Sequence, residues 1–443
     1  MILTEEHRIK KCRDKELFRQ IDAYCYRAKN LSNSVNYIIS QCYRIHRLLE
    51  NGEIIDSWEK GLIYRVNCAI HSYNSGRHGK RALRSVDDQN GFIADPYFLS
   101  WYMKTMDAYQ EMPYATCSQI CIQEKCREWK SFYHSTLSFQ KEPGKFLGKP
   151  RKPGYLDSIK GRGWLTITSQ NFRVEEEGNI RMPGFLKGLK IRARNQGVRQ
   201  IRVRTDNDEI CVQLIYEKKN EPATDGKTVM GVDLGIDNLM AVSLDSDASP
   251  FIINGRQIKS INRYYNKRRG ILQKISKTKN QMNNTKRIER LTGKRNRKIN
   301  DYLHKSSRKL IEQAQKKNVG LIVIGNNKGW KQKVAMGNRT NQAFVSIPYK
   351  KLIDMICYKA ELAGIQTRIV EEHYTSGTSY LDGEYPDRES YNKARRIQRG
   401  LFQSDKGKLI NADINAAYQI MKVAGIRNLA IKEDERVERI NVA

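Results

Sequence analysis

The 443-residue sequence predicts three parts: a helical N-terminal part, a small antiparallel β-domain and a C-terminal α/β domain with a mixed sheet. Three observations predict this division. Apolar residues recur every three or four positions as far as residue 137, short alternating runs follow as far as 222, and buried strands then alternate with helices. At about 150 residues per domain, a chain of this length suits two or three domains.

The helical pattern covers residues 11–137. Ile122, Cys126 and Trp129 share one predicted helix face, and Cys117 and Cys121 fall in the same pattern. This placement favours core packing over metal ligation for these cysteines. The polar segment 51–90, with its Asn-Gly pair and other glycines, predicts a connection between helices.

The β-domain is expected over residues 138–222. It begins with a basic linker whose prolines stop any helix, KEPGKFLGKPRKPG, and in which Lys149, Arg151 and Lys152 are candidates for touching a nucleic-acid backbone. The runs that follow predict antiparallel strands: WLTITS, NIRMPGF, LKIRAR, QIRVRTD and EICVQLIYEKK. Their outward positions are often Arg or Lys.

The C-terminal part, residues 223–443, has the order βββ-α-β-α-β-α. Three strands are predicted at 229–235, 239–244 and 250–254, and a basic helical hairpin at 255–317, broken near residues 283–284. The apolar run GLIVIG at 320–325 predicts a central strand covered on both faces. A helix over 349–363, a strand over 366–371 and a helix beginning near Asp413 complete an α/β unit with a mixed sheet.

The charge of the chain indicates a polyanionic partner. Lys and Arg number 80 against 48 Asp and Glu, a net charge of +32, and residues 255–317 hold 21 of the basic residues against three acids. A positive charge of this size favours binding to the phosphate backbone of a nucleic acid. A basic structural protein, or a basic protein that binds nucleic acid only nonspecifically, would share this composition. No apolar run approaches 18 residues, no secretory leader is evident, and the nine cysteines form no C-x-x-C pair, so we expect a cytosolic protein without a disulfide scaffold.

Two carboxylates stand where a metal site is expected. Asp233 ends the first strand between Gly231 and Gly235, two glycines that we expect to let a ligand approach the backbone. Asp413 begins a helix whose next turn consists of residues with small side chains, so we expect this helix to pack closely against a sheet. Carboxylate oxygens are the ligands that hard divalent ions take, and two such ions can promote phosphodiester displacement. A turn aspartate and a helix N-cap are the structural alternatives.

Several motifs together resemble a known family. They are, in chain order, GVDLGIDNL, DYLHKSSRKLI, VIGNNKGWKQ, FVSIPYKKLIDMICYKAELAGI, EEHYTSGTSYLD, RRIQRGLF and INADINAAYQI. Over residues 228–422 they resemble the ribonuclease H-like RuvC domain of TnpB-type RNA-guided nucleases and of compact type V CRISPR effectors. The resemblance implies that Asp233 and Asp413 are catalytic. It also implies an opening strand at 1–10, a helical recognition domain at 11–137 and a wedge β-barrel completed by 138–222.

The middle glutamate of that family is missing from its usual position. Gly325 stands there, at the end of the predicted GLIVIG strand. The neighbouring strand ends in Glu371 and Glu372, so a glutamate from this strand can reach the same metals. We expect Glu372 to be the relocated ligand, with Glu371 as the alternative, because strand alternation sends the two side chains to opposite faces. Both can also be solvent-facing loop acids.

The zinc ribbon that is common in relatives is also missing. Residues 376–411 contain no cysteine, so we expect no zinc site in the insert at about 377–405. In its place, Arg395, Arg396 and Arg399 are expected to hold a phosphate backbone near the active site. A solvated basic face is the alternative.

Together with these residues, the resemblance implies an RNA-guided DNA endonuclease that uses Mg²⁺ in a two-metal site formed by Asp233, Glu372 and Asp413. Its partners would be a guide RNA and a double-stranded DNA target beside a short flanking motif, with base pairing reading the sequence. The basic hairpin supplies further candidate nucleic-acid contacts: Arg268, Arg269, Lys294, Arg295, Arg297 and Lys298. Two other functions remain open, a nuclease-inactive RNA-guided repressor and an RNA-independent transposase. The guide origin, the flanking motif and the choice between a monomer and an asymmetric dimer on one RNA stay open as well.

Overall fold

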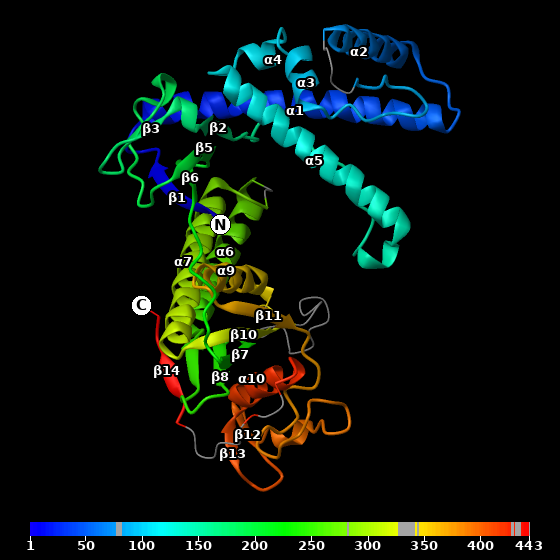
Figure 1. Ribbon diagram of the computed structural model, residues 1–443. Helices are drawn as coiled ribbons and strands as arrows, with labels where there is room; N and C mark the ends of the chain where they lie inside the picture. The colour runs from blue at the N-terminus through cyan, green and yellow to red at the C-terminus, as the bar shows by residue number, and fades with distance from the viewer. Residues whose placement is uncertain are drawn as a thin grey trace. The chain divides into compact units, whose positions relative to one another are not determined.

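The computed structural model describes residues 1–76, 82–280, 283–326, 342, 345–426, 429 and 436–442. The chain divides into two compact units (Figure 1), one formed by Ile2–Lys218 and the other by Met1 with Lys219–Ala443. No helix among the described residues is both long and apolar enough to cross a membrane.

The first unit consists of helices and short strands. Its elements are β1 (Ile2–Lys10), α1 (Lys15–Glu50), α2 (Ser57–Ser75), α3 (Pro96–Tyr102), α4 (Asp107–Gln110), α5 (Ala115–Lys141), β2 (Leu165–Thr168), β3 (Arg173–Val174), β4 (Ile180–Arg181), β5 (Val198–Asp206) and β6 (Glu209–Glu217), with short 3₁₀ turns at Pro143–Lys145, Ser169–Asn171 and Gly184–Leu186. Asp14 caps α1 by accepting from Leu17 N, and Asp56 and Glu59 form a capping box on α2.

The strands of this unit form an antiparallel sheet. In the described residues its order is β1-β6-β5-β2, and β3 pairs with β4 in a separate ribbon. The run LKIRAR was predicted to be a strand, but it makes only the isolated bridge of Arg192 to Asn179. The predicted closure into a barrel, and the predicted domain boundaries, stay predictions.

The second unit is built on a larger sheet. Its elements are β7 (Thr228–Leu234), β8 (Asn238–Leu244), β9 (Phe251–Asn254), α6 (Arg256–Asn280), α7 (Lys286–Lys316), β10 (Val319–Gly325), α9 (Tyr349–Leu362), β11 (Gln366–Val370), a 3₁₀ turn at Lys393–Arg395, β12 (Leu401–Gln403), β13 (Leu409–Asn411), α10 (Ala412–Val423) and β14 (Glu438–Ile440).

This sheet is mixed, as predicted. Its order over the described residues is β11-β10-β7-β8-β9-β14. β7, β8 and β9 are antiparallel, whereas β10 runs parallel to both β7 and β11. Since β10 and β11 are neighbours, the strand that ends at Gly325 lies beside the strand that leads to Glu372.

Helices cover the two faces of this sheet (Figure 1). Met230, Val232 and Leu234 of β7 enter a core with residues of α7 and α9, such as Leu303 and Leu352. A second core on the other face joins α10 to β8 and β9. The second core holds residues from several segments: Ala241, Ile252, Tyr380, Leu381, Ile414, Tyr418 and Met421.

Candidate active site

The alternation of β7 fixes the direction of Asp233. Val232 and Leu234 belong to the core with α7 and α9, so Asp233 between them points to the face that α10 covers. Gly231 lies on that same face, and a Cβ there would overlap with Ala417 O of α10. Gly231 therefore serves the close approach of helix and strand, which corrects the expectation that it leaves room for a ligand.

Gly235 also has a structural role. A Cβ at this position would lie 2.6 Å from Asn238 O, across the tight turn that joins β7 to β8. The turn thus gives a structural reason for glycine at this position, and the expected opening for a ligand at Gly235 stays a prediction. The same turn places Asp237 and Asn238 beside the end of β7, and sequence reasoning had assigned no role to either.

Asp413 lies in the first turn of α10 but does not cap the helix. Asn411 is the N-cap, because its Oδ1 accepts from Asp413 N at 3.0 Å and Ile414 N at 3.2 Å. The Asp413 carboxylate is thus left to face other groups. Asn238 Nδ2 donates to its Oδ2 at 2.8 Å, and Arg396 Nη2 donates to its Oδ1 at 3.3 Å.

Glu372 follows β11 and fills a space beside the end of β10. Gly325 pairs with Val370 in the parallel register, and a Cβ at Gly325 would overlap with Glu372 Oε1. The Glu372 carboxylate thus occupies the place where a side chain at position 325 would begin. Glu371 is different, since its side chain is 47% exposed and lies 4.0 Å from His373 Nε2.

Burial and mutual repulsion shape the charge of the site. Burial raises the pKa of Asp233 well above its usual range, and the Glu372 and Asp413 carboxylates raise it further. Burial also raises the pKa of Glu372 to about 7. Three carboxylates from three separate segments therefore interact at one end of the sheet, and a cation there would favour their charged forms.

The donor chemistry of Asp233, Glu372 and Asp413 suits hard divalent ions, which take carboxylate oxygens as ligands. Among the described residues, one group of three acids has ligand atoms all within 4.8 Å of one another, and it is a different group, Asp382, Glu384 and Asp405. Two ions of a phosphodiester site lie about 4 Å apart, so the ligands of a two-metal site need not all lie as close together as the ligands of a single ion.

Basic side chains of the insert reach the acids around this site. Arg396, 40% exposed, contacts Asp413, and Arg399 pairs with Asp237. Lys259 of α6 also pairs with Asp237, at 2.7 Å. Asp237 and Asn238 could have been found from the sequence, because they come shortly after Asp233, where the chain turns into the next strand.

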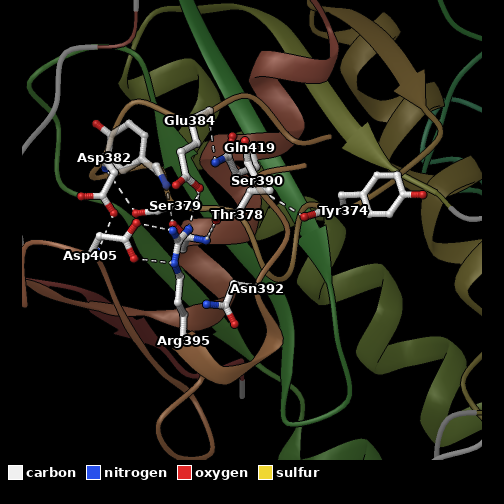
Figure 2. Close-up of polar contacts among 12 residues, drawn as sticks. Tyr374, Thr378, Ser379, Asp382, Glu384, Ser390, Asn392, Arg395, Asp405 and Gln419 are labelled. Carbon is white, nitrogen blue, oxygen red and sulfur yellow. Dashed lines mark hydrogen bonds and ion pairs between the residues drawn. The ribbon is translucent and has the colours of Figure 1, made fainter. Parts of the chain in front are cut away.

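Arg395 does not join this group. Its side chain is only 11% exposed and lies against Glu384 and Asp405 (Figure 2), in the cluster that also contains Asp382. The guanidinium of Arg395 already forms ion pairs with both carboxylates. This corrects the expectation that Arg395 holds a phosphate.

The other candidate nucleic-acid contacts divide into exposed and internally paired side chains. Arg295 is half-buried and paired within the protein: it donates to Asn262 Oδ1 at 2.8 Å and to Ser346 O at 2.6 Å, and its guanidinium lies over the Tyr265 ring. The expected phosphate contact of Arg295 is therefore disfavoured. The remaining candidates have exposed side chains: Lys149, Arg151, Lys152, Arg268, Arg269, Lys294, Arg297 and Lys298.

Acids that converge at one end of a mixed sheet define a candidate metal-binding site. Comparison with known families adds that residues 200–331 match OrfB of IS605, described as a probable transposase. Residues 349–420 match the TNB domain of Cas12f1-like proteins. These matches confirm the predicted resemblance to TnpB-type and Cas12f-type proteins.

Two curated relatives agree with these matches. A TnpB-like protein, ORF457 of Acidianus two-tailed virus, is 26% identical over 73% of this chain and 76% of that relative. The CRISPR-associated endodeoxyribonuclease Cas12f2 of Micrarchaeota archaeon (strain CG1_02_47_40) is 30% identical over 49% of this chain and 40% of that relative. The chain therefore matches less than half of the length of this second relative.

Among solved structures, a Cas12f1–sgRNA–target DNA complex aligns with 96% of this chain and 99% of its own, at 16% identity and a TM-score of 0.36. A score this low supports no conclusion about fold or binding.

Proposed function

We propose that the chain is an RNA-guided DNA endonuclease whose Asp233, Glu372 and Asp413 hold Mg²⁺ in a two-metal site. The observation that carries this proposal is the position of Glu372. Its carboxylate fills the space beside Gly325, next to Asp233, where the resembled family has its middle glutamate. In this proposal the third acid comes from the segment that follows the neighbouring strand β11, so the site keeps three carboxylates.

Divalent ions held by Asp233, Glu372 and Asp413 would supply the Lewis-acid chemistry that phosphodiester hydrolysis needs. The residues of this chain would supply their setting. Asn238 orients Asp413 through its Oδ2, and the weaker contact of Arg396 with Oδ1 leaves that oxygen for a metal. Arg396 then lies beside the site with its charge available for the phosphate of the substrate strand.

The charge of the chain supports a guide RNA and a DNA target as partners. Exposed Lys and Arg on α6 and α7 would grip the phosphate backbone without reading sequence, since base pairing with the guide reads the target. The helical region at 11–137 and the β-domain at 138–222 are proposed to contact the DNA beside the target.

The decisive experiment is target cleavage by the purified protein–RNA complex in Mg²⁺. We expect Asp233→Asn, Asp413→Asn and Glu372→Gln to abolish cleavage while the RNA content and the Tm stay close to wild type. Glu371→Gln is the matched control, because it removes the adjacent but exposed carboxylate. Equal cutting by Glu372→Gln and wild type would remove Glu372 from the site.

A nuclease-inactive RNA-guided repressor is the second candidate. The observation that favours it is Gly325, which leaves the usual position of the family's glutamate without a side chain. This candidate predicts tight, guide-dependent binding to target DNA, with no cleavage in either Mg²⁺ or Mn²⁺. An RNA-independent transposase would instead bind DNA and purify without a discrete RNA.

A further inference from the structure

A compact ionic cluster lies in the insert, outside the candidate active site (Figure 2). Arg395 Nη1 donates to Glu384 Oε2 at 2.6 Å, and Arg395 Nε donates to Asp405 Oδ1 at 2.9 Å. Its Nη2 contacts the second oxygen of Asp405, so that this pair is bidentate. Asp382 Oδ2 joins the group by accepting from Asp405 N at 2.9 Å.

Three carboxylates this close to one another are stabilised by a cation between them. Their ligand atoms all lie within 4.8 Å of one another, a spacing that would suit a bound metal ion. Like charges at this distance repel strongly where water is partly excluded. The guanidinium of Arg395 already supplies positive charge here, and its rigid fork matches carboxylate geometry. Residues 376–411 contain no cysteine that could form a thiolate zinc site.

The cluster is joined to the helix that carries Asp413. Glu384 O accepts from Lys422 Nζ at 2.8 Å and from Gln419 Nε2 at 3.3 Å, and both donors belong to α10. The Tyr380 ring stacks on Tyr418 with centroids 3.9 Å apart. The first half of the insert is thereby docked on α10.

Arg395 connects the second half of the insert to this docked half. It reaches back to Glu384 and forward to Asp405, which lies between β12 and β13. The next residue, Arg396, contacts Asp413, and Arg399 contacts Asp237. The position of Arg395 therefore fixes the backbone from which the side chains of Arg396 and Arg399 extend.

We propose that Arg395 is the internal cation that holds the insert folded without a metal ion, and that it is a positioning residue for Arg396 at the candidate active site. The second half of this statement rests on the proposed function. The first half does not depend on any catalytic activity.

Hydrogen–deuterium exchange of the full-length protein–RNA complex tests the first half. In wild type, we expect the protection of residues 379–405 to be the same with and without a chelator. Arg395→Ala should speed exchange in this segment by about tenfold or more, since local opening becomes easier. Arg395→Lys should lie between the two, because it keeps the charge but loses the bidentate fork.

Arg388→Ala is the matched control, because Arg388 is an exposed arginine of the same insert. Its exchange should equal that of wild type. The proposal is overturned if chelation removes the protection in wild type, if the purified protein carries a stoichiometric metal that protects this segment, or if Arg395→Ala exchanges like Arg388→Ala.

Cleavage tests the positioning role. Arg395→Ala and Arg396→Ala should each lower the rate, and the double variant should be no slower than Arg396→Ala alone, since the two residues act through one contact. Additive losses would overturn the positioning role. A wild-type complex that binds target but does not cut would instead refute the proposed function, while the exchange measurement would still decide whether Arg395 holds the insert.

Discussion

At the scale of single residues, Gly325 and Glu372 share one space. A Cβ at Gly325 would overlap with the Glu372 carboxylate, so a large side chain at 325 and the native Glu372 exclude each other. We expect Gly325→Glu to lose both stability and cleavage, and Glu372→Ala to lose cleavage. The double variant Gly325→Glu/Glu372→Ala should cleave at least about tenfold faster than expected if the two single losses simply multiplied. This factor corresponds to a coupling free energy of about 1.4 kcal/mol.

The measurement is the single-turnover rate of target cleavage for the four proteins of this cycle. Glu371→Ala combined with Gly325→Glu is the control, since Glu371 is exposed and does not fill the space. If the control is rescued as well as the Glu372 pair, the shared space is not the reason.

Asn238 is a second residue with a testable role. Its Nδ2 donates to Asp413 Oδ2 at 2.8 Å, so Asn238→Ala should remove the shorter of the two side-chain contacts that orient this carboxylate, leaving that of Arg396. Loss of such a supporting contact lowers metal affinity by roughly 10- to 100-fold. We expect the half-saturating Mg²⁺ concentration for cleavage to rise by about tenfold, and calorimetric titration with Mn²⁺ to show the same loss of affinity.

The control for this prediction is Asn220→Ala. Asn220 also donates to a carboxylate, Glu361 Oε1 at 3.1 Å, but lies on another segment. A rate that falls equally at all Mg²⁺ concentrations would show that Asn238 acts on folding instead of on the metal site.

The sequence predicted part of this site. Asp233 and Asp413 each stand at the end or the beginning of a predicted element, but it was the resemblance to a known family that selected them as catalytic candidates. The choice between Glu371 and Glu372 needed the register of β11, which the sequence does not contain. Arg295 and Arg395 could not be recognised as paired within the protein, because charge alone does not distinguish a guanidinium paired with the protein from one that faces solvent.

At the scale of elements, the contact between α10 and β7 sets the distance between two of the acids. Gly231 lets the backbone of Ala417 approach β7, and Met421 Cγ lies 2.7 Å from the place of a Cβ. Gly231→Ala must push the helix away, because a backbone oxygen cannot turn aside. We expect a loss of about 1–3 kcal/mol in the free energy of unfolding, together with lower cleavage. Thermal denaturation and the cleavage rate measure the two effects.

Gly270→Ala is the matched control for this change. Gly270 lies in α6, and a Cβ there would meet nothing within 4 Å. Alanine favours a helix over glycine by about 1 kcal/mol, so this variant should be neutral or more stable. Equal destabilisation by both substitutions would contradict the role of the close contact at Gly231.

Elements with a strong periodic pattern were predictable, and short ones were not. Except for β14, the strands of the mixed sheet and the helices that cover it lie where apolar periodicity placed them. β12 and β13 have three residues each, too few for alternation to be seen, and β14 pairs with β9 from far along the chain. LKIRAR alternates well but forms only a single bridge, because its backbone pairs with the chain over residues 178–180 alone.

At the scale of the whole molecule, the net charge of +32 should appear in the salt dependence of RNA binding. Each lost phosphate contact lowers the slope of log K against log salt by roughly 0.7 on a single strand and 0.9 on a duplex. Arg268→Gln with Arg269→Gln removes two exposed charges of α6, so the slope should fall by about 1.4 to 1.8.

Arg295→Gln is the control, because it removes a charge that is already paired within the protein. It should lower the Tm without changing the slope. Filter binding of the guide RNA at several salt concentrations measures the slopes. If Arg295→Gln changes the slope as much per charge as the α6 pair does, RNA binding depends on the total charge of the protein. The individual surface contacts proposed for α6 are then wrong.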